Sequence, residues 1–197
     1  MQLYTKFTED IFMKLRLLCA TLGVLPLLFA GAATAATATT TFNVTANVPS
    51  NCKVSATNLN FGTYTPGSGA VTGNSTISVN CTKGTAFTVA LNDGSSTGAS
   101  FTNRNMTGTG SADTAGNTAS TSDLLNYQLY TTSTVGSGGT VWGDGSTGTS
   151  TVAGTGTGMG TPQAIAETVY GQIPDSGANL SAVPGAYSDT VTVTVSY

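Results

Sequence analysis

Histidine is absent from this chain of 197 residues, and charged side chains are scarce, with six basic and nine acidic residues. The absence of histidine excludes a Ser–His–Asp or Cys–His catalytic site, because both need an imidazole as the general base. The scarcity of lysine and arginine leaves no basic patch that could neutralise phosphates. The composition therefore argues against these hydrolase classes and against nucleic acid or an anionic membrane surface as a partner.

Two motifs that look catalytic are explained by the abundance of glycine and serine. Residues 94–98 match G-x-S-x-G, but a nucleophile elbow needs a following helix and a histidine base. Residues 143–148 match G-x-G-x-x-G without the βαβ unit that would aim a helix at a pyrophosphate. The carboxylates stand singly, and Asp144 and Asp175 lie beside glycine or serine, as turn-forming aspartates do. We predict no enzymatic activity, no cofactor and no metal site.

The first 35 residues have the pattern of a secretion signal. Lys14 and Arg16 precede an apolar run over residues 17–33, and Ala33-Thr34-Ala35 is a small-x-small cleavage site. We expect cleavage before Ala36, with a second candidate before Thr39. Met13 is the expected initiator, which makes residues 1–12 an upstream extension of the reading frame. The run is short for a membrane span and has no charged stop-transfer flank, so no stable membrane insertion is expected.

Two of the three cysteines, Cys52 and Cys81, lie beyond this signal. An even pair in an exported chain indicates a disulfide. It would close a loop of roughly thirty residues and stabilise the fold by about 3–4 kcal/mol in the chain-entropy model.

The remainder of the chain predicts an all-β fold. Short apolar alternations are separated by turns rich in glycine and proline, and no window has a helical period. This pattern is typical of a β-sandwich with about six main strands, and the chain ends without an obvious seventh. Residues 95–122, which are almost entirely Gly, Ser, Thr and Asn, are expected to form a long loop. Trp142 and Tyr130 are expected to pack in the core or at an end of the sandwich, rather than to form a platform that binds a sugar. The six expected strands are 52–64, 76–82, 87–91, 124–131, 163–173 and 187–197.

A separate strand is predicted before the first cysteine, over residues 39–48. Its apolar residues alternate strictly with polar ones, which is the pattern of a half-buried β-strand. A strand that precedes the domain must pair with the exposed edge of a sheet. The apolar positions are Phe42, Val44, Ala46 and Val48, and the polar positions are Thr41, Asn43, Thr45 and Asn47.

Seven ordered blocks of this sequence resemble the spore coat protein U domain family. The similarity covers nearly all of the chain beyond the signal. The family includes rod subunits of archaic chaperone–usher pili of Gram-negative bacteria. The blocks are TFNVTA from Thr41, LNFGTY from Leu59 after Cys52, CTKGT from Cys81, LNYQLY from Leu125, VWGDG from Val141, VYGQIP from Val169 and GAYSDTVTV from Gly185.

The resemblance implies an incomplete immunoglobulin-like sandwich, residues 49–197, with a groove between its first and last strands. Residues 36–48 would be a donor strand that fills the groove of a neighbouring subunit by β-strand addition. The implied partners are identical or related pilin subunits, a periplasmic chaperone and an outer-membrane usher, and the implied location is an extracellular fimbria that supports adhesion and biofilm formation. The expected groove flanks are Val54, Leu59 and Phe61 on one side and Val191, Val193 and Val195 on the other.

Three alternatives remain open at this point. The chain could be a spore-coat or other extracellular coat protein with the same domain type. It could be a secreted immunoglobulin-like binding module or tip adhesin, although an adhesin needs a further receptor-binding domain. Pro49-Ser50-Asn51 could also turn the leading strand back into the groove of its own subunit.

Overall fold

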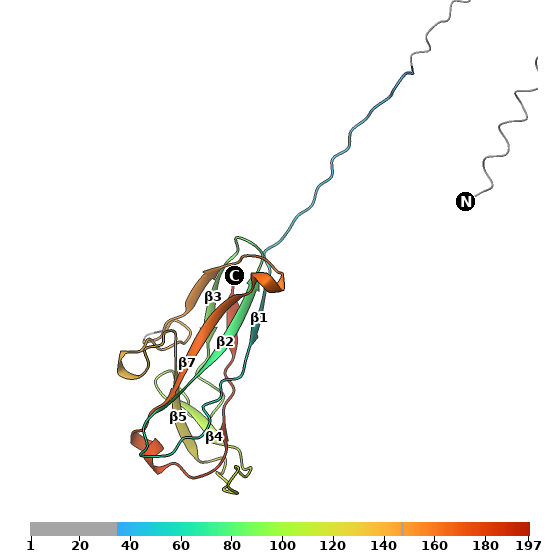
Figure 1. Ribbon diagram of the computed structural model, residues 1–197. Coiled ribbons are helices and arrows are strands. Elements are labelled where there is room, and N and C mark those ends of the chain that lie inside the picture. Colours follow the sequence, from blue (N-terminus) through green and yellow to red (C-terminus); the bar gives the residue numbers. More distant parts are fainter. Residues whose placement is uncertain (1–34, 147) are drawn as a thin grey trace, which may run out of the picture. The chain divides into compact units, whose positions relative to one another are not determined.

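The computed structural model describes residues 35–146 and 148–197 (Figure 1). Residues 46–197 form one compact unit, and the segment that precedes it is a separate unit. The predicted signal, its apolar run and the initiator Met13 lie outside the described residues, apart from Ala35 at the expected cleavage site. No helix among the described residues is long and apolar enough to cross a membrane.

Two antiparallel sheets form the compact unit, as the sequence predicted. In the six-stranded sheet the spatial order is β1-β2-β7-β5-β4-β8, and in the three-stranded sheet it is β6-β3-β9. β2 and β7 lie side by side and are the longest strands (Figure 1). The strands are β1 (Cys52–Ala56), β2 (Val71–Cys81), β3 (Ala86–Leu91), β4 (Arg104–Gly108), β5 (Leu124–Tyr130), β6 (Val152–Thr155), β7 (Ile165–Ile173), β8 (Tyr187–Ser188) and β9 (Val193–Ser196), and three short 3-10 helices are η1 (Gly136–Gly138), η2 (Thr161–Gln163) and η3 (Gly177–Ser181).

The core lies between the sheets and follows the period of two. Ile77, Val79 and Cys81 of β2 are at most 1% exposed. Alternate residues of β3 face them from the other sheet. Trp142 is fully buried and donates its indole N–H to the Val89 carbonyl oxygen at 3.0 Å, and Tyr130 is 5% exposed. Both residues are therefore buried, in agreement with the predicted packing in the core or at an end of the sandwich.

The prediction of a continuous loop over residues 95–122 is wrong, because this stretch contains β4. β4 pairs with both β5 and β8. Its buried residues include Arg104 and Gly108, so no apolar alternation marks it in the sequence. Two other expected strands are shorter than predicted: 52–64 ends at Ala56, and 187–197 is divided into β8 and β9.

The leading segment is extended chain with no strand assigned over residues 35–51. Phe42 and Val44 are each 85% exposed, and Val48 is 77% exposed. The strand predicted over residues 39–48 is therefore not formed here, and it stays a prediction about an assembled state.

Candidate functional site

An open groove of about 480 Å³ enters the core of the sandwich along one side. One flank, residues 56–61, is the end of β1 and the chain that follows it. The other, residues 187–193, comprises β8, the chain that joins it to β9 and the first residue of β9. Ser75 is the one polar residue that the two long central strands contribute to the lining. The floor consists of apolar side chains that also belong to the core: Ile77, Leu91, Met106, Tyr127, Leu129 and Val169.

Each flank contains a stretch of backbone that has no backbone partner. β1 is an edge of the six-stranded sheet and β9 is an edge of the three-stranded sheet. Among the bonds that the described residues make, neither segment 58–61 nor Val191 has a backbone–backbone hydrogen bond. Unpaired N–H and C=O groups above an apolar floor form a template for one more β-strand.

Four of the six predicted groove residues line this groove. They are Leu59 and Phe61 on the first flank and Val191 and Val193 on the second. Val54 instead lies in the register of β1 opposite Val79 and is 42% exposed. Val195 pairs with Val89 within the three-stranded sheet and packs against the core. The groove begins where β1 ends, which is why these two valines lie outside its lining.

The first flank packs against a pair of glycines whose role the sequence interpretation missed. Gly73 of β2 and Gly171 of β7 are cross-strand partners. A Cβ atom at Gly171 would lie 2.8 Å from Leu59 Cδ1 and from Phe61 Cζ. At Gly73 it would lie 3.3 Å from Leu59 Cδ2 and 3.4 Å from Phe61 Cδ1. An isolated glycine in an alternating strand is the sequence signal for such a close approach.

Tyr127 connects the groove floor to its polar end. Its ring meets Phe61 edge to face, with centroids 6.2 Å apart. Its hydroxyl donates a hydrogen bond to Asp189 Oδ2 at 2.6 Å. Burial, followed by this bond, raises the pKa of Tyr127 far above its ordinary value, so the phenol stays protonated.

Asp189 anchors the second flank. Its Oδ1 accepts hydrogen bonds from the backbone N–H groups of Ser95 and Thr190, both at 2.8 Å, and from the Ser95 hydroxyl at 2.8 Å. The serine of the G-x-S-x-G match is the next residue, Ser96, and its hydroxyl donates to the same Oδ1 at 3.4 Å. It is thus part of a turn held by a carboxylate.

Asp175 holds the loop that follows the first flank. Its carboxylate accepts hydrogen bonds from the Tyr64 hydroxyl at 2.7 Å and from the backbone N–H groups of Gly67 at 2.9 Å and Gly69 at 2.7 Å. The bond from Tyr64, followed by the two backbone bonds, lowers the pKa of Asp175. Desolvation, followed by the same carboxylate, raises the pKa of Tyr64 to about 12.

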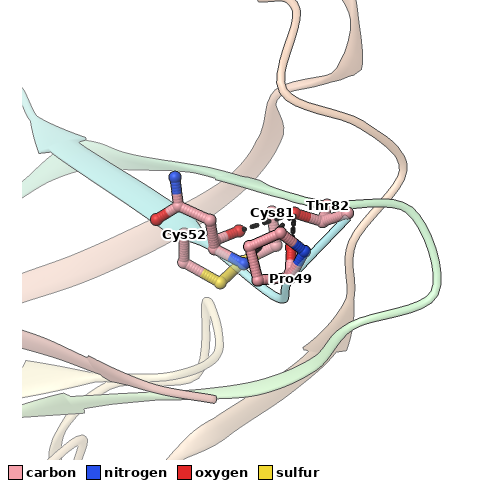
Figure 2. Close-up of a disulfide and its surroundings, with 5 residues drawn as sticks. Pro49, Cys52, Cys81 and Thr82 are labelled. Atoms are coloured by element: carbon pink, nitrogen blue, oxygen red, sulfur yellow. Dashed lines mark hydrogen bonds between the residues drawn. A yellow bond between two sulfur atoms is a disulfide. The ribbon is translucent and has the colours of Figure 1, made fainter. Parts of the chain in front are cut away.

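The predicted disulfide joins Cys52 and Cys81, with a Cα–Cα distance of 4.1 Å (Figure 2). Beside it, Thr82 holds the residues just before β1. The Thr82 hydroxyl accepts a hydrogen bond from the Asn51 N–H at 3.1 Å and lies 3.4 Å from the Pro49 carbonyl oxygen, to which it donates. The Thr82 N–H donates to the Asn51 carbonyl oxygen at 2.9 Å. The root of the leading segment is therefore fixed to the end of β2.

These features define a two-sheet antiparallel β-sandwich with an open groove. The model of the Spore Coat Protein U domain family matches residues 38–194, so the chain belongs to this family, as its sequence blocks predicted. Comparison with curated proteins gives no match.

Among solved structures, the chain is similar to a complex from Acinetobacter baumannii, the CsuC–CsuE chaperone–tip adhesion subunit pre-assembly complex of archaic chaperone–usher Csu pili. The identity is 22%, the TM-score is 0.45, and the match covers 76% of this chain and 40% of that chain.

Proposed function

We propose that this protein is a structural subunit of a secreted fimbria, an archaic chaperone–usher pilus, that polymerises by donor-strand complementation. The observation that carries the proposal is the groove with an apolar floor and unpaired flanks, in a chain whose leading segment presents exposed apolar residues. Membership of the spore coat protein U domain family supports it, because this is a family of structural proteins.

The donor strand would be residues 36–48, with Phe42, Val44, Ala46 and Val48 as its plugs. Residues two apart along a strand face the same way, so these four side chains could enter one groove together. Burial of three large apolar side chains and one alanine contributes about 5–8 kcal/mol. Each backbone hydrogen bond adds about 0.5–1.5 kcal/mol, and ordering and association subtract several kcal/mol.

The partners follow from the exposed groove. An uncovered sheet edge above apolar floor residues promotes aggregation, so a subunit in transit needs a cover, which a periplasmic chaperone would provide. The Cys52–Cys81 disulfide suits an oxidising compartment. An outer-membrane usher would then pass the subunits to the cell surface.

A donor segment that fills the groove of the next copy makes a heterologous contact that does not close. Such contacts propagate as a filament. Adhesion and biofilm formation would be properties of the assembled fimbria. A coat built from the same domain would use the same groove, and deletion of genes for the chaperone and usher distinguishes the two, because only a pilus is lost.

The test is electrophoresis of the purified protein without boiling. Donor-strand polymers are expected to persist in detergent as a ladder that heating collapses to one band, because release requires opening the sandwich. Deletion of residues 36–48 is expected to abolish the ladder. Filaments from the truncated protein would refute the donor role, and a full-length protein that stays monomeric would indicate that the leading strand fills its own groove.

A further inference from the structure

Leu59 and Phe61 pack against a part of the six-stranded sheet where two paired residues are glycines and have no side chains. Val169, Gly171 and Ile173 share the inner face of β7, and Val169 and Ile173 are 5% and 2% exposed. Gly171 stands between them where the alternation calls for a further large apolar residue. Its cross-strand partner in β2 is Gly73, which shares the inner face with Ile77.

This missing pair of side chains leaves a depression that the first flank fills. The ends of Leu59 and Phe61 approach Gly171 so closely that a Cβ atom there would be 2.8–2.9 Å from them, against 3.4–4 Å in ordinary contact. The two side chains therefore lie deeper in the sandwich than any other residue pair at these positions would allow. The Phe61 ring also packs edge to face against the Tyr127 ring on the floor, and a displacement of Phe61 along the sheet would break this contact.

We propose that the Gly73–Gly171 pair positions the groove flank and thereby sets the size of side chain that the groove accepts. The glycines hold Leu59 and Phe61 below the rim, so that a large apolar plug fits above them. A side chain at Gly171 would push both residues outward into the space of the plug. The inference rests on the proposed donor-strand function and adds to it a determinant of plug size.

The test compares single methyl additions in the full mature chain. Gly171→Ala is expected to slow the growth of the detergent-resistant ladder at least tenfold, while the urea midpoint of the monomer, followed by fluorescence of the single tryptophan, changes little. Gly73→Ala is expected to have a smaller effect, because its nearest contacts would be 3.2–3.4 Å. Ala166→Val, on an exposed position of the same strand, is the control and is expected to leave the ladder unchanged.

A rescue variant separates positioning from a general loss of stability. Phe61→Leu removes the ring atoms that a Gly171 Cβ would meet, so it is expected to restore ladder growth in the Gly171→Ala background at least in part. Unchanged ladder growth in Gly171→Ala, or no rescue by Phe61→Leu, would overturn the inference. If Gly171→Ala does not fold, the test rests on Gly73→Ala. Ladder growth of Gly73→Ala at the rate of the natural protein would then overturn the inference. A natural protein that forms no ladder would instead refute the proposed function.

Discussion

The C-terminal end of strand β3 and the nearby groove differ in whether their polar groups have hydrogen-bond partners within the domain. At the end of β3, buried Arg104 donates hydrogen bonds to the Asn92 carbonyl oxygen and, at 2.7 Å, to the Trp142 carbonyl oxygen. It also donates to the Gln128 side chain. In the groove, segment 58–61 and Val191 have no backbone partners within the described residues. The first region completes its hydrogen bonds within the domain, and the second leaves backbone groups open to the strand that we propose.

The difference teaches that the groove is not simply a poorly packed part of the domain. Arg104 is fully buried, and desolvation lowers its pKa. A buried charge of this kind is tolerated only when its hydrogen bonds are complete. No buried side-chain nitrogen or oxygen among the described residues lacks a partner. The chain satisfies even a buried guanidinium and still leaves part of the groove backbone without partners, and this contrast supports the proposal that the groove receives an external strand.

The largest effect is expected for a variant that removes the hydrogen bonds of Arg104 at the end of β3. Arg104→Ala removes the donors to the buried Trp142 carbonyl oxygen and the half-buried Asn92 carbonyl oxygen, and it opens a cavity. Each unsatisfied group costs about 1–3 kcal/mol, so we expect a loss of about 3–5 kcal/mol in the free energy of unfolding. Urea unfolding followed by Trp142 fluorescence measures it. Lys53→Ala, on the exposed face of β1, is the control and should change stability by less than about 0.5 kcal/mol.

The second effect falls on the open region alone. Phe42→Asp places a charge where the proposed plug enters an apolar floor, which costs several kcal/mol. We expect loss of the detergent-resistant ladder with no change in the urea midpoint of the monomer, because Phe42 is 85% exposed. Asn43→Asp adds the same charge at the next residue, on the opposite face of the strand, and should retain the ladder. Equal losses for both variants would contradict the alternating-plug account.

A smaller effect is expected at the root of the leading segment. Thr82→Val keeps the shape of the side chain and removes the hydroxyl that binds Asn51 and Pro49. Each lost hydrogen bond contributes about 0.5–1.5 kcal/mol, so the ladder should form several-fold more slowly while the disulfide stays intact. Thr155→Val, at an exposed position in β6, serves as the control. Identical rates for the two variants would show that the root does not constrain assembly.

The sequence predicted those parts of the structure that depend on alternation. The strands around Ile77 and Val169 carry a period of two that is visible without a structure. The family resemblance, in turn, led to Leu59 and Phe61 as residues of one groove flank, and both line the groove. β4 was missed because Arg104 stands where an apolar residue would mark a strand, and only tertiary contacts make that residue tolerable.

Gly73 and Gly171 were missed for a related reason. A glycine in a strand becomes informative only when its cross-strand partner and the side chains above it are known. The groove boundary was misplaced at Val54 because nothing in the sequence shows that β1 ends at Ala56. Register and strand ends depend on pairing between distant segments, which a single sequence does not display.

The smallest expected effect is a dependence on pH at the loop beyond the groove flank. Hydrogen bonds from Tyr64, Gly67 and Gly69 lower the pKa of Asp175 in the folded state. A carboxyl whose folded pKa is depressed stabilises the fold above its unfolded pKa of about 3.9, and this stabilisation is lost as the pH falls through the folded value. Between about pH 4 and pH 2 the natural protein should therefore lose stability. Asp175→Asn should lose less over that interval, because its amide does not titrate, and urea midpoints measured across the range test this. Asp113→Asn removes a second carboxyl of lowered pKa, which is held by bonds within its own turn, and shows the size of effect that such a carboxyl has away from this loop. A pH profile of Asp175→Asn that overlays that of the natural protein would show that the carboxylate does not hold this loop.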